Sequence, residues 1–177
     1  GQKEEKIFKV IENVRPVRGR MELAATRKNG ATVYVDYAHT PDAIEVALKS
    51  LKPHILGKLI IIIGAGGERD EGKRPLMGQA AEKNSDFVII TDDNPRNEDP
   101  SLIHQMIKNG IQDNSKVRVI ADRAEAILTA VDLLENGDGL LIAGKGHETE
   151  QFIGENVFPF DDFEQASLSV ASLDGVE

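Results

Sequence analysis

A short apolar run, KLIIIIGAGG at residues 58–67, places the strongest constraint on how this chain can fold. Its four consecutive isoleucines, Ile60–Ile63, form a β-branched segment that is bounded by glycines and too short for a typical helix, which predicts a buried strand. A strand that is apolar on both faces is typical of parallel sheets, because helices cover both faces of such sheets. We therefore expect an α/β fold.

The rest of the chain alternates between the same two kinds of segment. Amphipathic stretches predict helices at residues 41–53, 74–84, 100–111, 122–134 and 161–173, and apolar runs predict strands at 58–63, 86–92, 116–121, 139–144 and 156–160. Residues 21–37 predict a β-hairpin, because Asn29-Gly30 supplies a turn that requires positive φ. Together these segments predict a single domain over residues 1–177, with a Rossmann-like, open, mostly parallel sheet, flanking helices and an N-terminal β-hairpin. We expect residues 156–160 to form an edge strand and 161–173 a closing helix.

Charge and composition narrow the range of partners. The formal net charge of −9 repels a phosphate backbone, so we expect no nucleic-acid partner. The sequence has no cysteine, which excludes disulfides, thiolate metal sites and cysteine nucleophiles and fits a reducing cytoplasm. It has no apolar run of about 18 residues, and its first ten residues lack the regions of a signal peptide. We therefore expect a soluble, cytoplasmic chain with no membrane partner.

Polar loops follow four of the predicted strands, at residues 36–43, 64–75, 91–100 and 143–149. In open α/β sheets, ligands bind at the carboxyl ends of the strands, where loops and helix N-termini converge. The loops therefore predict a binding site at that edge of the sheet. The four histidines show no metal-ligand spacing, so we expect no dedicated metal site.

The loop at 64–75 allows two interpretations. Gly67–Lys73 has the spacing G-x-x-x-x-G-K of a phosphate-binding loop, but Arg74 stands where a Ser or Thr would hold magnesium. Arg69 likewise replaces the third glycine of the dinucleotide fingerprint. The segment is either a glycine turn from strand to helix or an anion site around Arg69, Lys73 and Arg74.

The loop at 91–100 follows its strand directly and contains Arg96 after a proline. An arginine fork behind the acid and amide of residues 93–94 suits a site that grips a small carboxylate while the acid or amide takes an amine. The alternative is a helix-entry loop with an N-cap at Asn97 or Asp99, which explains only the second half of the segment.

The other two loops contain further candidate contacts. Lys145 lies between glycines that allow a ligand close to the backbone, and Glu148 could receive an ammonium group, although a turn with solvated charges is an equal alternative. Asp36 suits a ribose hydroxyl and His39 a phosphate. The alternative is that Asp36 is an ordinary strand-end residue and Thr40 a helix N-cap.

Five segments in order, GRME, DYAHTPDA, GAGGERDEGKRPLMG, TDDNPR and AGKGHE, resemble the C-terminal domain of the Mur ligase family. The resemblance covers nearly the whole chain and is in particular to the MurE group, which adds meso-diaminopimelate to a peptidoglycan precursor. DNPR is similar to the signature of this group, whereas lysine-adding relatives replace its arginine. Diaminopimelate differs from lysine by one distal carboxylate, so a pocket that selects it should present a cation such as Arg96.

The resemblance implies an ATP-dependent amide-forming ligase of peptidoglycan synthesis, and therefore of cell-wall biogenesis, cell shape and cell division. ATP with Mg²⁺ would phosphorylate the D-glutamyl γ-carboxylate of UDP-MurNAc-L-Ala-D-Glu, and the diaminopimelate amine would attack the acyl phosphate. The implied contacts to meso-diaminopimelate are Arg69, Asp93, Asn94, Pro95, Arg96, Gly144 and Glu148. The implied contacts to ATP are Arg20, Asp36 and His39.

Members of this family also have an N-terminal domain for the UDP substrate and a central ATPase domain that holds most of the ATP and magnesium. No stretch of this sequence supplies these parts, so we expect no catalytic residue and no metal ligand here, and no ligase activity from this chain alone. Two alternatives stay within the superfamily, a lysine-adding and a folylpolyglutamate synthase-like ligase domain, and Arg96 argues against both. A third is a stand-alone Rossmann-like module that binds an amino acid or a nucleotide.

Overall fold

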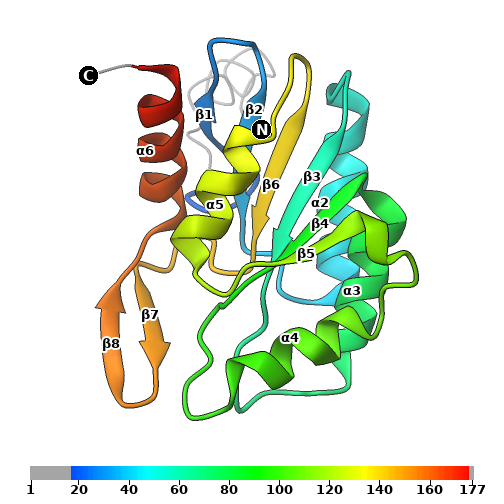
Figure 1. The fold of residues 1–177 in the computed structure, drawn as a ribbon, viewed down its shortest axis with the longest axis vertical. Helices are drawn as coiled ribbons and strands as arrows, with labels where there is room; N and C mark the ends of the chain where they lie inside the picture. Colours follow the sequence, from blue (N-terminus) through cyan, green and yellow to red (C-terminus); the bar gives the residue numbers. More distant parts are fainter. Residues whose placement is uncertain (1–16, 176–177) are drawn as a thin grey trace, which may run out of the picture.

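A computed structural model of the chain describes residues 17–175, so the first ten residues, for which we expect no signal peptide, lie outside the described range. The described residues form a six-stranded sheet, a two-stranded sheet and helices on both faces of the larger sheet (Figure 1). The elements, in chain order, are β1 Glu22–Thr26, β2 Thr32–Asp36, α2 Pro41–Leu51, η1 Lys52–His54, β3 Leu59–Ile63, α3 Lys73–Asn84, β4 Phe87–Ile90, α4 Pro100–Lys108, η2 Asn114–Lys116, β5 Val117–Val119, α5 Arg123–Asp132, β6 Gly139–Ala143, β7 Glu150–Ile153, β8 Asn156–Pro159 and α6 Asp162–Asp174.

The larger sheet has the strand order β1-β2-β6-β3-β4-β5. Strands β1 and β2 form the predicted antiparallel hairpin, and Gly30 in its turn has a φ of 89°. The other neighbouring strands of this sheet are parallel. The predicted α/β fold, with its mostly parallel sheet, flanking helices and N-terminal hairpin, is therefore confirmed.

The side chains of β3 alternate between two hydrophobic cores. Ile61 and Ile63 belong to the core with α2, α3 and α4, whereas Ile60 and Ile62 belong to the core with α5 and α6. Figure 1 shows these two groups of helices on opposite faces of the sheet. All five residues of β3 are buried, as the run of isoleucines predicts, and each such side chain contributes roughly 1.5–3 kcal/mol relative to an exposed one.

The order of the strands in the larger sheet favours a ligand site at the carboxyl ends of its parallel strands. The chain runs outward from β2 through β3 and β4 to β5, then returns through α5 to place β6 between β2 and β3. Because the crossovers are right-handed, the outward helices α2, α3 and α4 cover one face and the return helix α5 covers the other. The loop after β3 leads to α3 on one face, and the chain after β6 leads through the β7–β8 hairpin to α6 on the other. Divergence of this kind creates ligand sites in open α/β sheets.

The segment at 156–160 departs from the prediction. Strand β8 forms there, but it pairs with β7 in a separate antiparallel sheet and is no edge strand of the larger sheet. Strand β7 was not predicted, because its residues, EQFI, follow a glycine-rich loop and do not form an apolar run. The two strands extend as a hairpin beside the larger sheet, and α6 follows them as predicted (Figure 1).

Helices α3 and α4 pack backbone to backbone at two glycines. A Cβ at Gly78 in α3 would lie 2.1 Å from the carbonyl oxygen of Ile107, and a Cβ at Gly110 would lie 1.8 Å from the carbonyl oxygen of Pro75. Neither position has room for a side chain. This close contact holds the C-terminal end of α4 against α3, and α4 itself begins after the N-cap Asp99, near the end of one of the predicted binding loops.

None of the helices within residues 17–175 combines the length and the apolarity needed to cross a lipid bilayer. The same residues contain no group of three or more His, Asp or Glu side chains that could together hold a metal ion.

Candidate functional site

The four loops identified in the sequence converge at the carboxyl edge of β2, β3, β4 and β6. They enclose a cavity of about 230 Å³. Pockets for drug-sized ligands span roughly 300–1,000 Å³, so this one suits a ligand of about the size of an amino acid. Seven of the ten predicted site residues line it, namely His39, Arg69, Asp93, Asn94, Arg96, Gly144 and Glu148.

Arg96 lines the cavity from the loop after β4. Its φ of 54° is unusual for a residue with a side chain, and strand β7 holds it there. The N–H of Arg96 donates to the carbonyl of Phe152 at 3.0 Å, and its carbonyl accepts from the N–H of Gly154 at 2.7 Å. Its Nη1 donates to the carbonyl oxygens of Gly67 at 2.9 Å and Asn94 at 3.3 Å. In the described part of the chain the guanidinium has no acidic partner, so its other N–H groups can reach a ligand.

Asn94 and Glu148 form a polar network beside Arg96. Asn94 is only 4% exposed and donates from Nδ2 to Oε2 of Glu148 at 3.0 Å. The side chain of Lys145 is fully buried; its Nζ donates to Oδ1 of Asn94 at 3.1 Å and to the same Glu148 oxygen at 3.4 Å. Oε1 of Glu148 accepts no hydrogen bond from any described residue, so it could accept one from a ligand ammonium group.

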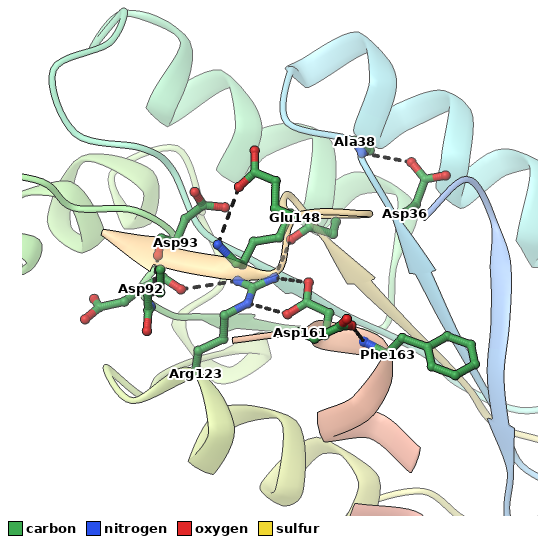
Figure 2. Close-up of polar contacts among 12 residues, drawn as sticks. Asp36, Ala38, Asp92, Asp93, Arg123, Glu148, Asp161 and Phe163 are labelled. Carbon is green, nitrogen blue, oxygen red and sulfur yellow. Dashed lines mark hydrogen bonds and ion pairs between the residues drawn. The ribbon is translucent and has the colours of Figure 1, made fainter. Parts of the chain in front are cut away.

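A buried ion pair between Arg123 and Asp162 supports the strand ends next to the cavity. Arg123, at the start of α5, donates from Nε and Nη2 to the two carboxylate oxygens of Asp162, each at 2.7 Å. It also donates to the main-chain carbonyls of Asp92 at 3.2 Å and Ala143 at 3.1 Å, at the ends of β4 and β6 (Figure 2). The ion pair therefore joins the two strands whose loops carry Asn94 and Glu148.

Asp93 and Glu148 lie on the same side of Arg123 (Figure 2). Gly144 lets Asp93 come close, since a Cβ at this glycine, whose φ is 119°, would lie 2.7 Å from Oδ2 of Asp93. Burial alone would lower the pKa of Arg123, but the ion pair with Asp162, helped by Asp93 and Glu148, outweighs it and raises that pKa. Arg123 therefore remains protonated and gives the two cavity acids a buried counter-charge.

The glycine loop after β3 brings two of its three candidate cations to the cavity. Arg69 and Lys73 line it, and Nζ of Lys73 donates to the carbonyl of His39 at 3.2 Å. The prediction of an anion site that includes Arg74 is wrong. Its side chain is fully buried and paired with Glu98, with Nη2 at 2.8 Å from Oε2, so it is not available to a ligand.

Pro95 and Asp36 do not line the cavity. A Cβ at Gly67 would be 1.9 Å from the carbonyl oxygen of Pro95, so these two segments of backbone are in contact. The carboxylate of Asp36 accepts from the N–H of Met21 at 2.7 Å and from the N–H of Ala38 at 2.8 Å (Figure 2). Asp36 thus has the strand-end role considered in the sequence analysis, and each of its oxygens retains a second lone pair.

Arg20 lies at an aromatic cluster beside the cavity. Its guanidinium carbon is 5.0 Å from the centre of the Tyr37 ring, a distance typical of cation–π contacts. The rings of His39 and His147 lie 4.5 Å and 5.2 Å from the same tyrosine ring. The cluster thus brings Arg20 and His39, two of the predicted ATP contacts, to one aromatic ring.

Three buried side chains that support the site were not predicted from the sequence: Arg123, Asp162 and Gln151. Arg123 and Asp162 directly follow helix N-cap aspartates, so their charges looked like ordinary, exposed features of a helix start. Gln151, whose Nε2 donates to the carbonyl of Asp93 at 2.9 Å, lies in the strand that had not been predicted. Only their position next to the predicted loops could have identified them.

The site places cations and acids around one small volume. Arg69, Lys73 and Arg96 bring positive charge to the cavity, and Asp93 and Glu148 bring negative charge. Such a lining fits a ligand that carries both carboxylate and ammonium groups.

Residues 19–146 match the family model described as Mur ligase, glutamate ligase domain. The chain is 49% identical over 166 residues to the UDP-N-acetylmuramoyl-L-alanyl-D-glutamate–2,6-diaminopimelate ligase of Bradyrhizobium diazoefficiens, which covers 94% of this chain and 33% of that protein. It is 50% identical over 167 residues to the ligase of the same name from Synechococcus elongatus, which covers 94% of this chain and 34% of that protein.

A solved structure of a UDP-N-acetylmuramoyl-L-alanyl-D-glutamate–2,6-diaminopimelate ligase resembles the fold with a TM-score of 0.83 and 40% sequence identity. The similarity covers 93% of this chain and 34% of that one. The chain therefore spans about a third of the length of the curated relatives that it matches.

Proposed function

This chain belongs to the Mur ligase family through its glutamate ligase domain, and we propose that it is the amino-acid-holding domain of an ATP-dependent ligase. That ligase would add meso-diaminopimelate to UDP-MurNAc-L-Ala-D-Glu during peptidoglycan synthesis. The names of the two relatives described above support this substrate pair. The lack of cysteine in the sequence fits a reaction in the reducing cytoplasm.

The observation that carries the proposal is the position of Arg96. Its guanidinium lines a cavity of amino-acid size and has no acidic partner in the described part of the chain. A planar fork with open donors is suited to a carboxylate, and diaminopimelate has a distal carboxylate that lysine lacks. Arg96 would therefore select the substrate by binding this group.

The rest of the lining complements the other groups of the same amino acid. Glu148, with one oxygen free of hydrogen bonds to described residues, would accept from the distal ammonium group, with Asp93 close by. Arg69, Asn94 and Gly144 complete the proposed diaminopimelate contacts, and Pro95 holds the loop against Gly67. In the ligase reaction, these residues would orient the second amine toward the acyl phosphate.

ATP would reach this domain at the aromatic cluster. Asp36 could accept a hydrogen bond from the ribose through its remaining lone pairs, and Arg20 and His39 lie at the same tyrosine. We place most of the contacts to ATP and Mg²⁺ on a central ATPase domain of the longer ligase, as the family resemblance implies. ATP would supply the energy of amide formation by phosphorylating the acceptor carboxylate.

The experiment that tests this proposal exchanges Arg96 for alanine in the full-length ligase that carries this domain. We expect Arg96→Ala to reduce the ratio of kcat/KM for meso-diaminopimelate over lysine about tenfold to hundredfold, the effect of losing a hydrogen-bonded charge pair. Steady-state assays of phosphate release with each amino acid measure this ratio.

A matched control replaces Arg118, an exposed arginine on the edge strand β5, with alanine. Arg118→Ala should leave both the preference and the rate unchanged, because its guanidinium forms no ion pair within residues 17–175 and lies away from the cavity lining. If Arg96→Ala keeps the preference of the parent enzyme, Arg96 does not select the amino acid.

A further inference from the structure

Lys145 is a buried cation that lines no part of the cavity, yet contacts three groups of the site. Its side chain is fully buried. Its Nζ donates to Oδ1 of Asn94 at 3.1 Å, to Oε2 of Glu148 at 3.4 Å and to the carbonyl oxygen of Glu150 at 2.5 Å. An ammonium group taken out of water is stable only with such partners, so these three oxygens determine where it lies.

The three partners of Lys145 come from three segments of the chain, which its ammonium group therefore connects. Asn94 comes from the loop after β4, Glu148 from the loop after β6, and Glu150 from the first position of β7. Oδ1 of Asn94 also accepts from the N–H of Phe152 at 3.1 Å. The ammonium group and this main-chain donor thus share one amide oxygen, which binds β7 to the loop.

Strand β7 in turn contacts each end of the DNPR segment. Gln151 donates to the carbonyl of Asp93 at 2.9 Å, and the main chain around Ile153 pairs with Arg96 through hydrogen bonds of 3.0 Å and 2.7 Å. A residue with a side chain rarely adopts a φ of 54° unless its surroundings over-determine it. The pairing with β7 is what imposes this conformation on Arg96, and with it the direction of the guanidinium.

We propose that Lys145 is a positioning residue of this site: its buried ammonium joins Asn94 and Glu148 to strand β7, which holds Arg96 toward the cavity. Lys145 does not touch the ligand in this arrangement. Its ammonium group binds the amide oxygen of Asn94 and Oε2 of Glu148. Oε1 of Glu148 therefore remains available to the ligand. The identity of that ligand rests on the proposed function, but the role of Lys145 in the chain does not.

The first experiment needs no substrate. In the ¹⁵N-labelled 177-residue chain, Lys145→Met should accelerate amide hydrogen exchange of Arg96, Phe152 and Gly154 by at least about tenfold, because the contacts that close β7 onto the loop are lost. The amides of β3 should keep their exchange rates, which separates a local opening from global unfolding. Unchanged exchange at the three amides would overturn the proposal. Lys58→Met, at an exposed lysine, is the matched control.

A chemical rescue tests whether the ammonium group itself is responsible. The chain has no cysteine, so Lys145→Cys provides one unique thiol that can be alkylated in denaturant before refolding. The S-aminoethyl form restores an ammonium at nearly the length of lysine, and we expect slow exchange at Arg96 to return. The S-(2-hydroxyethyl) form has the same length without the charge and should not restore it. Comparing the two alkylated forms also tests the role of the ammonium group if Lys145→Met does not fold. Equal protection of the Arg96 amide in both forms would contradict the proposal.

The second experiment uses the full-length ligase. We expect Lys145→Met to raise the KM for diaminopimelate about tenfold to hundredfold while the KM for ATP changes by less than about twofold, because only the amino-acid subsite loses its orientation. An unchanged KM for diaminopimelate in an active ligase would overturn the positioning role. If the parent enzyme does not use diaminopimelate at all, the proposed function fails, and the exchange experiment alone decides the role of Lys145.

Discussion

At the scale of single residues, buried cationic side chains support the site. Three of the largest fully buried side chains are the cations of Arg74, Arg123 and Lys145. Each is bound to an acid and to main-chain or amide oxygens, although Nε of Arg74 has no partner within residues 17–175. A buried charge is costly unless every donor finds a partner, so such groups add little net stability but allow few alternative arrangements. They therefore hold the loops of the cavity in one geometry.

Asp162→Asn tests this at the ion pair with Arg123. The substitution leaves a buried guanidinium without its counter-charge, so we expect a loss of about 3–5 kcal/mol in the free energy of unfolding, measured by urea denaturation. Asp132→Asn, at an exposed position in α5, should change it by less than about 0.5 kcal/mol.

A double variant separates the charge from the packing. Replacing both partners, in Arg123→Met with Asp162→Leu, should cost less than Asp162→Asn alone, because no uncompensated charge remains. If the double variant is the less stable of the two, the unpaired charge is not the main cost.

At the scale of elements, the positions of α3 and α4 depend on the absence of side chains at their contact. Gly78 and Gly110 let the two backbones approach until main-chain atoms touch. Because α4 directly follows the DNPR loop, any separation of the two helices would also move the end of that loop. The helix pair thus supports the site, and the first residue of α3, Lys73, also lines the cavity.

Gly78→Ala should destabilise the chain, even though alanine favours a helix over glycine by about 1 kcal/mol. A Cβ at 2.1 Å from the carbonyl oxygen of Ile107 forces the helices apart, and we expect a net loss of about 1–3 kcal/mol in the free energy of unfolding. Thermal and urea denaturation measure it. Gln79→Ala, at the next and exposed position of α3, should stay within about 0.5 kcal/mol of the parent chain, and a gain in stability at Gly78→Ala would show that the helices separate freely.

At the scale of the whole molecule, acid should unfold this chain. The hydrogen bond from Arg74 lowers the pKa of Glu98 below its ordinary value of 4.5, and the hydrogen bond from the N–H of Lys28 lowers that of Asp174 below 3.8. A lowered pKa contributes stability that is fully present above the ordinary value and is lost as the pH falls through the folded-state value. Below the pI of about 5.0 the growing positive charge acts in the same direction.

We therefore expect the free energy of unfolding to fall as the pH decreases from about 4.5, and to fall less steeply in Glu98→Gln. Urea denaturation at a series of pH values measures both slopes. Glu155→Gln, at an exposed acid whose carboxylate makes no hydrogen bond within residues 17–175, should retain the slope of the parent chain. An equal slope in Glu98→Gln and the parent would mean that the pair with Arg74 contributes nothing to this dependence.

The sequence alone predicted the six strands of the larger sheet and most of the cavity lining, but it wrongly placed residues 156–160 at an edge of that sheet. The run at Ile60–Ile63 and the alternation of segments reflect local patterns of burial, and ends of parallel strands must share one edge, so the convergence of the loops follows from topology. What the sequence did not reveal depends on contacts between distant residues. In the sequence Arg74 looks available to a ligand, and only the folded structure shows its ion pair with Glu98. The positive φ of Arg96 likewise depends on its pairing with β7.

The late position of β6 in the chain has a consequence for synthesis. Within residues 17–175 this strand lies between β2 and β3, and it follows the other five strands of the larger sheet in the chain. A nascent or truncated chain that stops before Gly139 would expose two unpaired strand edges, which invite association with other chains. Ribosome-bound intermediates of this domain should therefore depend on chaperones until the central strand emerges and closes the gap.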